Sequence, residues 1–345
     1  MIRTEKSTAG VDRLFTPLQF WITVLAISLI VIFLYAIKAG AIDISVTNLL
    51  TLHLTDTEAV VLGEIRLPRI LLACLVGSAL GISGAAMQGV FRNPLADPSL
   101  IGIAGGASLA VATMIVIVGP LPGLFALYGL GAAAFAGGLI TSFFILQLSR
   151  LSGDFSVTHM LLAGIAFNAL TMAGTGFLMF LSDDQEMRAL TFWTMGSLSG
   201  ALWPAVSFLA TIVIPVLCIL IRQATALNVF MLGEENANYI GVDTHRLKRT
   251  VILCSALSVG AAVAVSGLIG FIGLVVPHLI RLTVSSDHRY LFPLSALLGA
   301  GLLLFADTIA RTIVLPTEMP VGILTSLIGG PFFLWLLVKQ LRLRH

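Results

Sequence analysis

Charged residues are scarce in this sequence. They make up 10% of its 345 residues, whereas apolar residues make up 58%. A soluble domain carries about 25% charged residues, so this chain has too few to cover a water-facing surface. The composition excludes a soluble enzyme, a nucleic-acid-binding protein and a disordered chain, and the net charge of +2 indicates no polyanionic partner. We therefore expect a polytopic membrane protein.

Groups that carry enzymatic chemistry are also few. Cys74, Cys218 and Cys254 lie in apolar stretches without a CxxC spacing, which predicts free, buried thiols and no metal site. The HExxH pattern is absent, and His159 and His278 are isolated, as is more typical of packing residues than of ligands. None of the four lysines follows a glycine, so the chain has no P-loop. The sequence predicts a protein that is not an enzyme and holds no permanent cofactor, so energy for pumping must come from a partner.

Long apolar stretches are abundant instead. About 20 apolar residues form a helix that crosses the hydrocarbon core of a bilayer. Stretches bounded by charges, proline or glycine predict ten such spans, at 18–38, 66–88, 99–118, 124–147, 157–181, 193–222, 249–266, 269–286, 294–314 and 322–340. These spans use most of the chain, so we expect one all-α transmembrane domain over residues 1–345.

The distribution of lysine and arginine predicts the orientation of these spans. Cytoplasmic loops of membrane proteins carry an excess of these two residues. With ten spans, both termini share a side, and that side holds fourteen of the nineteen, against five on the other, namely Lys38, Arg66, Arg69, Arg188 and Arg311. We therefore expect both termini in the cytoplasm, including the tail 1–17. The same assignment makes 223–248 the largest cytoplasmic loop and 39–65 the largest external one.

Two segments rich in small residues suggest an internal repeat. Residues 77–84 read GSALGISG and residues 260–267 read GAAVAVSG, with glycine, alanine, serine and glycine at the same spacing. The first segment lies in a span predicted to run inward, and the second in a span predicted to run outward. Related segments of opposite direction are typical of inverted-repeat transporters. Small residues also recur wherever membrane helices pack closely, so packing alone remains an alternative.

Few ionisable residues lie inside the predicted spans. A proton-coupled carrier places acidic residues or histidines in pairs near the middle of the membrane. Asp307 and His278 are the only candidates, and neither has an obvious partner in the sequence. A secondary transporter is therefore the weaker alternative to a pump driven by a partner, and a membrane enzyme lacks any catalytic constellation.

The loop 228–249, NVFMLGEENANYIGVDTHRLKR, is suited to contact such a partner. It mixes charges with the apolar residues Val229, Phe230, Leu232, Tyr239 and Ile240, and two glycines divide it into short helical pieces. An amphipathic segment of this kind can place its apolar side in a groove of another protein. An interfacial helix on lipid is the alternative, but its two glutamates would be repelled by anionic headgroups.

Several long motifs resemble the FecCD-type permeases, the membrane subunits of type II ABC importers for heme, ferric siderophores and cobalamin. They are RLPRILLACLVGSALGISGAAMQGVFRNPLADPSLIGIAGGASLA (66–110), LGEENANYIGVDTHRLKR (232–249), SGLIGFIGLVVPHLIRL (266–282), DHRYLFPLSALLGAGLLLFADTIAR (287–311) and EMPVGILTSLIGGPFFLWLL (318–337). The resemblance covers the chain from about residue 60 onward, with the motifs in the family's order.

The resemblance implies a fold like that of the cobalamin-importer permease, with ten helices per subunit. It also implies a homodimer in the bacterial inner membrane, with the path along its two-fold axis. The partners implied are two cytoplasmic ATPase subunits, which use ATP and Mg²⁺, and a periplasmic substrate-binding protein.

Residue roles follow from the resemblance, position by position. Arg66, Arg69 and Arg311 match the external arginines that receive carboxylates of the binding protein, and exposed guanidiniums can pair with carboxylates bidentately. Anchoring of helix ends at the membrane interface is the alternative role for these arginines. The segment around Leu232, Gly233, Glu234, Ala237, Gly241 and Val242 matches the coupling helices that contact the ATPase. Asn93, Leu95, Val157 and Thr158 match the cytoplasmic gate, although Val157 is apolar where relatives often carry a hydroxyl.

The cargo is expected to be heme, because the motifs after residue 232 look most similar to the heme branch of the family. A ferric siderophore and cobalamin are the next alternatives. His159, Met160, Met172 and Met179 lie on the fifth span, which lines the path in this family. Soft thioethers suit a large flat porphyrin, although methionine also fills gaps in packed helices.

Overall fold

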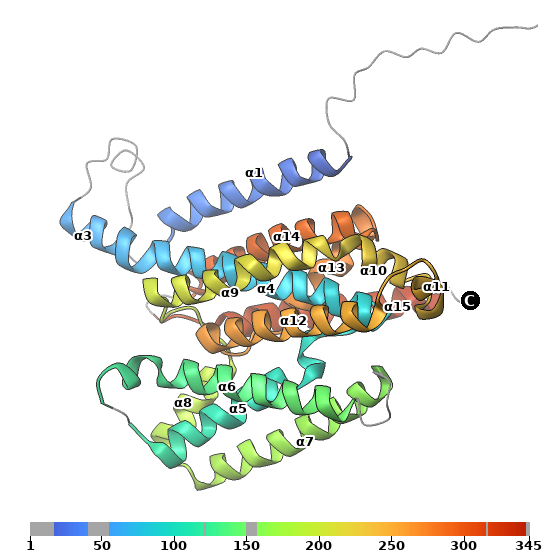
Figure 1. Cartoon of the computed structure of the whole chain (residues 1–345). Coiled ribbons are helices and arrows are strands. Elements are labelled where there is room, and N and C mark those ends of the chain that lie inside the picture. Colours follow the sequence, from blue (N-terminus) through green and yellow to red (C-terminus); the bar gives the residue numbers. More distant parts are fainter. Residues whose placement is uncertain (1–16, 41–54, 121, 150–156, 315–316, 343–345) are drawn as a thin grey trace, which may run out of the picture.

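The computed structural model describes residues 17–40, 55–120, 122–149, 157–314 and 317–342, and these residues form helices and no strand. The long helices lie roughly side by side along one common direction (Figure 1). In chain order the elements are α1 (Pro17–Lys38), α3 (Asp56–Val60), the π-helix η1 (Val61–Arg66), α4 (Leu67–Val90), the 3₁₀-helix η2 (Pro98–Ile101), α5 (Ile103–Thr113), the π-helix η3 (Met114–Val118), α6 (Leu124–Leu148), α7 (Val157–Leu181), α8 (Asp184–Thr194), α9 (Trp203–Arg222), α10 (Ala224–Phe230), α11 (Glu234–Tyr239), α12 (Thr244–Ser266), α13 (Ile272–Thr283), α14 (His288–Ala310) and α15 (Val321–Arg342).

The ten predicted spans all correspond to helices. In the described part of the chain, seven helical runs are long and apolar enough to cross a membrane, namely α1, the run from α3 through α4, α6, α7, α9, α12 and α14. Three shorter apolar helices, at Ile103–Val118, Ile272–Thr283 and Val321–Leu336, correspond to the other three predicted spans. The expected all-α membrane fold is confirmed.

Two features near residue 190 differ from the expectation. The sixth span was expected from 193, but α9 begins at Trp203, because Gly196 adopts a left-handed φ of 70° and interrupts the helix. A helix that the apolar pattern did not predict, α8, precedes it. Asp183 and Glu186 form a capping box there, since each side chain accepts a hydrogen bond from the other residue's backbone N–H.

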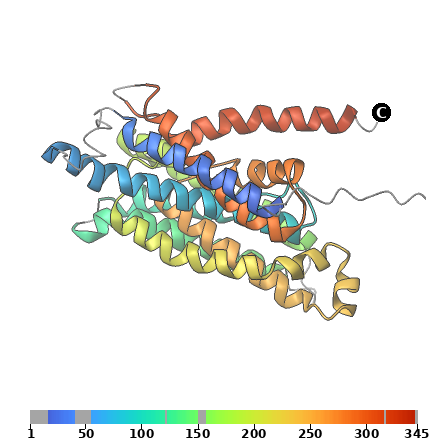
Figure 2. The same ribbon diagram turned by 90° about the horizontal axis from the view of Figure 1, so that it is seen from above.

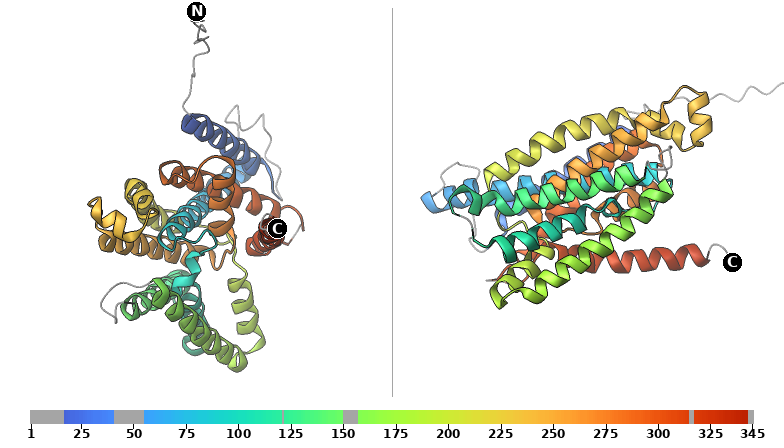
Figure 3. Two further views of the ribbon diagram at one scale, coloured as in Figure 1. Left: turned by 90° about the vertical axis from the view of Figure 1, so that its right-hand side faces the viewer. Right: turned by 60° about the horizontal axis from the view of Figure 1, so that its bottom comes forward.

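Helix α4 is the centre of the subunit. It is buried along most of its length and contacts α9, α12, α13 and α14 (Figures 2 and 3). Glycine makes this possible where backbones meet. A Cβ at Gly77 would collide with the backbone at Gly299, and a Cβ at Gly84 would collide with the backbone at Gly273. The small residues of the predicted repeat therefore serve close helix packing.

The two repeat segments lie on helices of opposite direction, as an inverted repeat requires. Residues 77–84 lie on α4, which leads away from α3, and residues 260–267 end α12, which leads away from α11 at the other end of the bundle (Figure 1). Each is followed by a short helix, α5 or α13. Both short helices begin after a residue with left-handed φ, Gly102 at 77° and Phe271 at 68°.

Helices α7 and α15 lie at the edges of the subunit. Within the described residues, α15 packs mainly on α13 and α14, and it stands apart from the bundle in two views (Figures 2 and 3). Helix α7 packs on α5 and α6 and leaves most of its length exposed. In an isolated subunit, exposed apolar faces of this kind contact lipid or a second copy of the chain.

The cysteines are free, as expected, but they are not all buried. Cys254 is buried, Cys74 is half-buried and Cys218 is exposed on α9. The expectation of burial was wrong for Cys218, because an apolar membrane helix can turn part of its surface toward lipid instead of protein.

Candidate functional site

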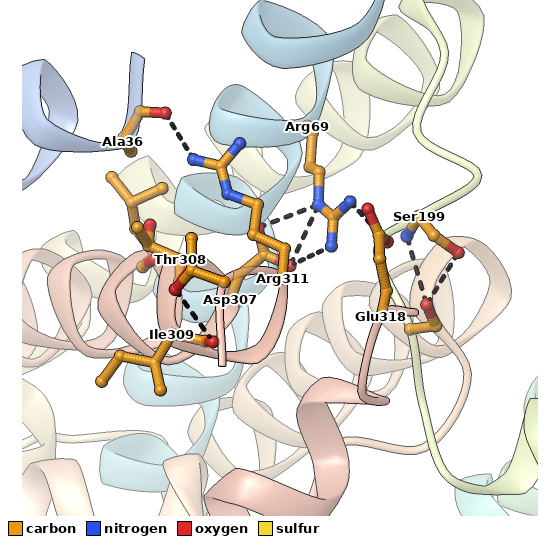
Figure 4. Close-up of polar contacts among 11 residues, drawn as sticks. Ala36, Arg69, Ser199, Asp307, Thr308, Ile309, Arg311 and Glu318 are labelled. Atoms are coloured by element: carbon orange, nitrogen blue, oxygen red, sulfur yellow. Dashed lines mark hydrogen bonds and ion pairs between the residues drawn. The ribbon is translucent and has the colours of Figure 1, made fainter. Parts of the chain in front are cut away.

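A cluster of charged side chains joins α4 to α14 at the end of the bundle where α3 lies. The Arg69 guanidinium donates to Asp307 from Nε, at 3.1 and 3.0 Å to the two carboxylate oxygens, and from Nη2 at 2.9 Å. Its Nη1 donates to Glu318 at 2.8 Å. Figure 4 shows Arg69 held between the two carboxylates. Such bidentate, charge-assisted bonds are strong and fix the orientation of the guanidinium.

Arg66 and Arg311 complete the cluster by capping α1. Arg66 Nη1 donates to the carbonyl oxygens of Ile37 at 2.6 Å and Lys38 at 3.2 Å, and Arg311 Nη2 donates to that of Ala36. The last carbonyls of a helix have no partner within it, and the helix dipole makes that end negative. Two cations therefore stabilise the end of α1 against α4 and α14.

The arginines are not exposed, contrary to the expectation from the sequence. Their exposed fractions are 3% for Arg66, 6% for Arg69 and 5% for Arg311, because internal carboxylates and helix carbonyls accept their hydrogen bonds. Asp307, expected to lack a partner, is fully buried against Arg69. Docking by these arginines stays a prediction. The pairing of Arg69 with Asp307 was missed because the two residues lie 238 positions apart in the sequence.

The opposite end of the bundle carries the predicted coupling segment as two short helices, α10 and α11. Gly233 precedes α11 and Gly241 follows it. Their φ values of 124° and 96° are ones that other residues adopt with strain. Leu232, Tyr239 and Ile240 are exposed by 67%, 88% and 63%. Large apolar side chains that are this exposed, on a loop outside the predicted spans, indicate a contact with another protein.

Polar bonds hold α11 firmly on α12. Glu234 forms an ion pair with Lys248, and Thr244 Oγ1 donates to Asn238 Oδ1 at 2.9 Å. Ala237 is fully buried on the inner side of α11, and Val242 is half-buried. Because the inner side is fixed in this way, the exposed side of α11 is a preformed surface.

A second contact ties α10 to α14. Asn228 Nδ2 donates to Asp287 Oδ1 at 2.6 Å, and Asn228 Oδ1 accepts from the backbone N–H of His288 at 2.9 Å. The Arg289 guanidinium hydrogen-bonds Asp287, and these bonds lower the pKa of the carboxyl to about 2. The sequence pattern gives no sign of this contact, because its partners lie about sixty residues apart.

Phe230 anchors the same helix inward. It was expected among the apolar residues offered to a partner, but it is 1% exposed and packs under the Arg92 guanidinium, 4.4 Å from the ring centre. The apolar side of α10 packs on the bundle, with Ala224, Leu227 and Phe230 buried. The surface that a partner can reach is therefore formed by α11 and by Leu232, which precedes it.

The predicted gate residues are accessible where they are described. Asn93, Leu95 and Thr158 are exposed, and Asn93 Oδ1 accepts from the backbone N–H of Leu95 at 3.0 Å. The side chain of Val157 lies outside the described residues. The end of α4 and the start of α7 lie at the same end of the bundle as α10 and α11 (Figure 1).

The residues predicted to line the path differ in exposure. His159 and Met172 are exposed, Met172 by 78%, and Met179 is half-buried. Met160 is fully buried within the subunit, which does not favour a path-lining role for it. Its side chain points from α7 into the packed interior instead. Among the described residues, no group of three His, Cys, Asp or Glu side chains is placed to hold a metal ion.

A cavity of about 620 Å³ borders α15. It is lined by Met195 after α8, by Leu268 and Gly270 before α13, and by Gly322 and Leu327 on α15. The cavity thus lies where the irregular segment between α12 and α13 meets the edge helix α15.

Residues 28–339 match the FecCD transport family. The chain belongs to this family. It is therefore a multi-pass membrane protein and the permease of an ABC importer, as the motifs indicated. This FecCD permease is 50% identical over 316 residues to the hemin transport system permease protein HmuU of Yersinia pestis, across 92% of this chain and 94% of that protein.

Cobalamin permeases and a solved transporter are also similar. The cobalamin import system permease protein BtuC of Halobacterium salinarum is 42% identical over 297 residues, across 86% of this chain and 78% of that protein. The vitamin B12 permease BtuC of Vibrio cholerae is 40% identical over 286 residues. A metal-chelate type ABC transporter solved in an inward-facing conformation shares the fold with a TM-score of 0.82 and 33% identity, across 92% of this FecCD permease and 98% of that chain.

Proposed function

We propose that this FecCD permease is the translocating subunit of a heme importer. The observation that carries the proposal is its 50% identity to a hemin permease along almost the whole of both chains, against 42% for a cobalamin permease. Transport of a ferric siderophore or of cobalamin is the alternative.

In the proposed assembly, two copies of the chain form the path, two cytoplasmic ATPase subunits supply energy, and a substrate-binding protein docks outside. Both termini then lie in the cytoplasm. The exposed Leu232, Tyr239 and Ile240 would contact the ATPase, because they present a preformed apolar surface at the end opposite to the arginine cluster. The substrate-binding protein would dock on the end of the bundle that holds the arginine cluster.

The edge helix α7 supports a path between two copies. Its exposed residues include His159 and Met172, and a thioether is a soft, flexible contact for a flat porphyrin. A wall of weakly interacting groups also favours transport, because tight binding inside the membrane would slow release of the cargo.

Uptake by proteoliposomes tests the cargo. The permease would be reconstituted with its ATPase subunits, and its hemin-loaded binding protein would be added outside, with ATP inside. We expect ATP-dependent accumulation of hemin, and at least tenfold less of cyanocobalamin or ferrichrome supplied in the same way. Accumulation of cobalamin or ferrichrome in preference to hemin would contradict the proposed cargo but keep the importer. Hemin uptake without the ATPase subunits would instead indicate a secondary transporter.

A crosslink tests the dimer axis. Thr158 is exposed at the start of α7, so two copies that meet along α7 place their Thr158 residues near each other. Thr158→Cys, in a background in which Cys74, Cys218 and Cys254 are replaced, should give an intersubunit disulfide whose yield changes with bound ATP. Met160→Cys is the matched control, because Met160 is fully buried and should not crosslink. Absence of a crosslink at Thr158, Asn93 and Leu95 alike, in every nucleotide state, would contradict a path along the dimer axis.

A further inference from the structure

Two carboxylates share the guanidinium of Arg69, and they differ in exposure. The side chain of Asp307 is 0% exposed and that of Glu318 is 43% exposed, while the Arg69 side chain is 7% exposed. Asp307 alone already forms a bidentate pair with Nε and Nη2. Glu318 is thus a second, outward-facing carboxylate on a charge that has an internal partner (Figure 4).

A buried donor beside this pair favours another carboxylate at this place. Arg311 Nε is buried without a hydrogen-bond partner among the described residues. Arg311 Nη2 donates to a neutral carbonyl group, that of Ala36, and not to a carboxylate. Of the two carboxylates on Arg69, Glu318 is the one that solvent can reach.

We propose that Glu318 occupies the place on Arg69 that a carboxylate of the docking substrate-binding protein takes, and that docking displaces it. This inference rests on the proposed docking role of the arginine cluster. A half-exposed ion pair contributes little to stability, so an incoming carboxylate can replace it at small cost. Asp307 stays in place during the exchange and keeps the guanidinium oriented.

The position of Glu318 in the chain links its displacement to helix α15. Glu318 lies between α14 and α15, three residues before Val321, and Met319 N–H donates to the Ala310 carbonyl oxygen at 3.1 Å. Helix α15 borders the cavity of about 620 Å³. Release of Glu318 therefore acts on the start of an edge helix that packs on few neighbours. Docking outside is in this way communicated to α15 and to the cavity that this helix borders.

The first experiment measures docking to the complete transporter in nanodiscs, with its purified, hemin-loaded binding protein as the probe. Glu318→Gln keeps the size of the side chain but removes the competing charge. We expect its Kd to fall about threefold to fivefold, the equivalent of one exposed ion pair. Glu64→Gln is the matched control, because Glu64 is an exposed glutamate of η1 at the same end of the bundle. Its effect measures the change in net charge alone.

An unchanged or higher Kd for Glu318→Gln, relative to Glu64→Gln, would overturn the proposal. Glu318 would then only hold the segment 317–320 in place. The thermal unfolding midpoint shows whether the variant is folded, and Glu318→Asp, which keeps the charge but shortens the side chain, should lower the Kd by a smaller factor. Docking of the unsubstituted transporter that is independent of salt would show separately that the arginine cluster is not the docking site.

The second experiment follows α15 directly. Leu327 is 63% exposed on α15, and Leu327→Cys can be labelled in the background without native cysteines. Docking should change the labelling rate, and Glu318→Gln should move that rate toward the docked value without any binding protein. A labelling rate that docking changes but Glu318→Gln does not would overturn the communication from Glu318 to α15.

Discussion

Asp307→Ala is expected to destabilise the subunit by about 3–5 kcal/mol, the range measured when one partner of a buried ion pair is removed. Asp307 is fully buried, and Arg69 would keep only the half-exposed Glu318. The buried Arg69 guanidinium would then have one half-exposed carboxylate to balance its charge. The measurement is the thermal unfolding midpoint of the purified permease in detergent, together with the yield of monodisperse protein.

Two variants separate charge from packing in this result. Glu318→Ala should lower stability by less than about 1 kcal/mol, because a partly exposed pair is screened by solvent. Arg69→Met combined with Asp307→Leu should recover much of the loss from Asp307→Ala, since apolar residues often replace a buried pair without penalty. An unfolding midpoint of Asp307→Ala equal to that of the unsubstituted protein would show that the pair is not a determinant of stability.

Gly241→Val is expected to abolish ATP-driven uptake while the permease stays folded. Gly241 has a φ of 96°, and a Cβ there would meet no atom within 4 Å, so the cost is backbone strain and not a collision. A left-handed conformation costs an ordinary residue about 1–2 kcal/mol, and a β-branched residue more. The turn between α11 and α12 would relax, and the exposed Tyr239 and Ile240 would lose their position against the ATPase.

The measurements are uptake in proteoliposomes, retention of the ATPase subunits during purification, and the unfolding midpoint. Gly241→Asn is the matched control, because asparagine tolerates left-handed φ, and it should retain most of the uptake. Normal uptake by Gly241→Val would contradict the assignment of α10 and α11 as the segment that couples the permease to the ATPase.

Local pattern predicted most of the fold. Helix α7 occupies the predicted residues 157–181, and nine other predicted spans correspond to helices, because span length and charged ends are local properties of the sequence. The break before α9 was missed, since it depends on Gly196, whose position is packed against the segment near Leu268. Helix α8 was missed because its signal is a capping box and not an apolar run.

The sequence by itself determined a membrane protein of ten spans, the FecCD family and the places of its short loops, because hydropathy and long motifs are read residue by residue. Only the tertiary structure decided what the charged groups do. Arg69 and Asp307 are 238 positions apart, and the burial of each depends on α4 and α14 packing together through Gly77 and Gly299. The exposure of Met172 and the burial of Met160 likewise depend on which side of α7 faces α5 and α6. Pairing and exposure depend on which residues are neighbours in space. The sequence of an apolar helix carries no local signal for which of its sides will pack against other helices.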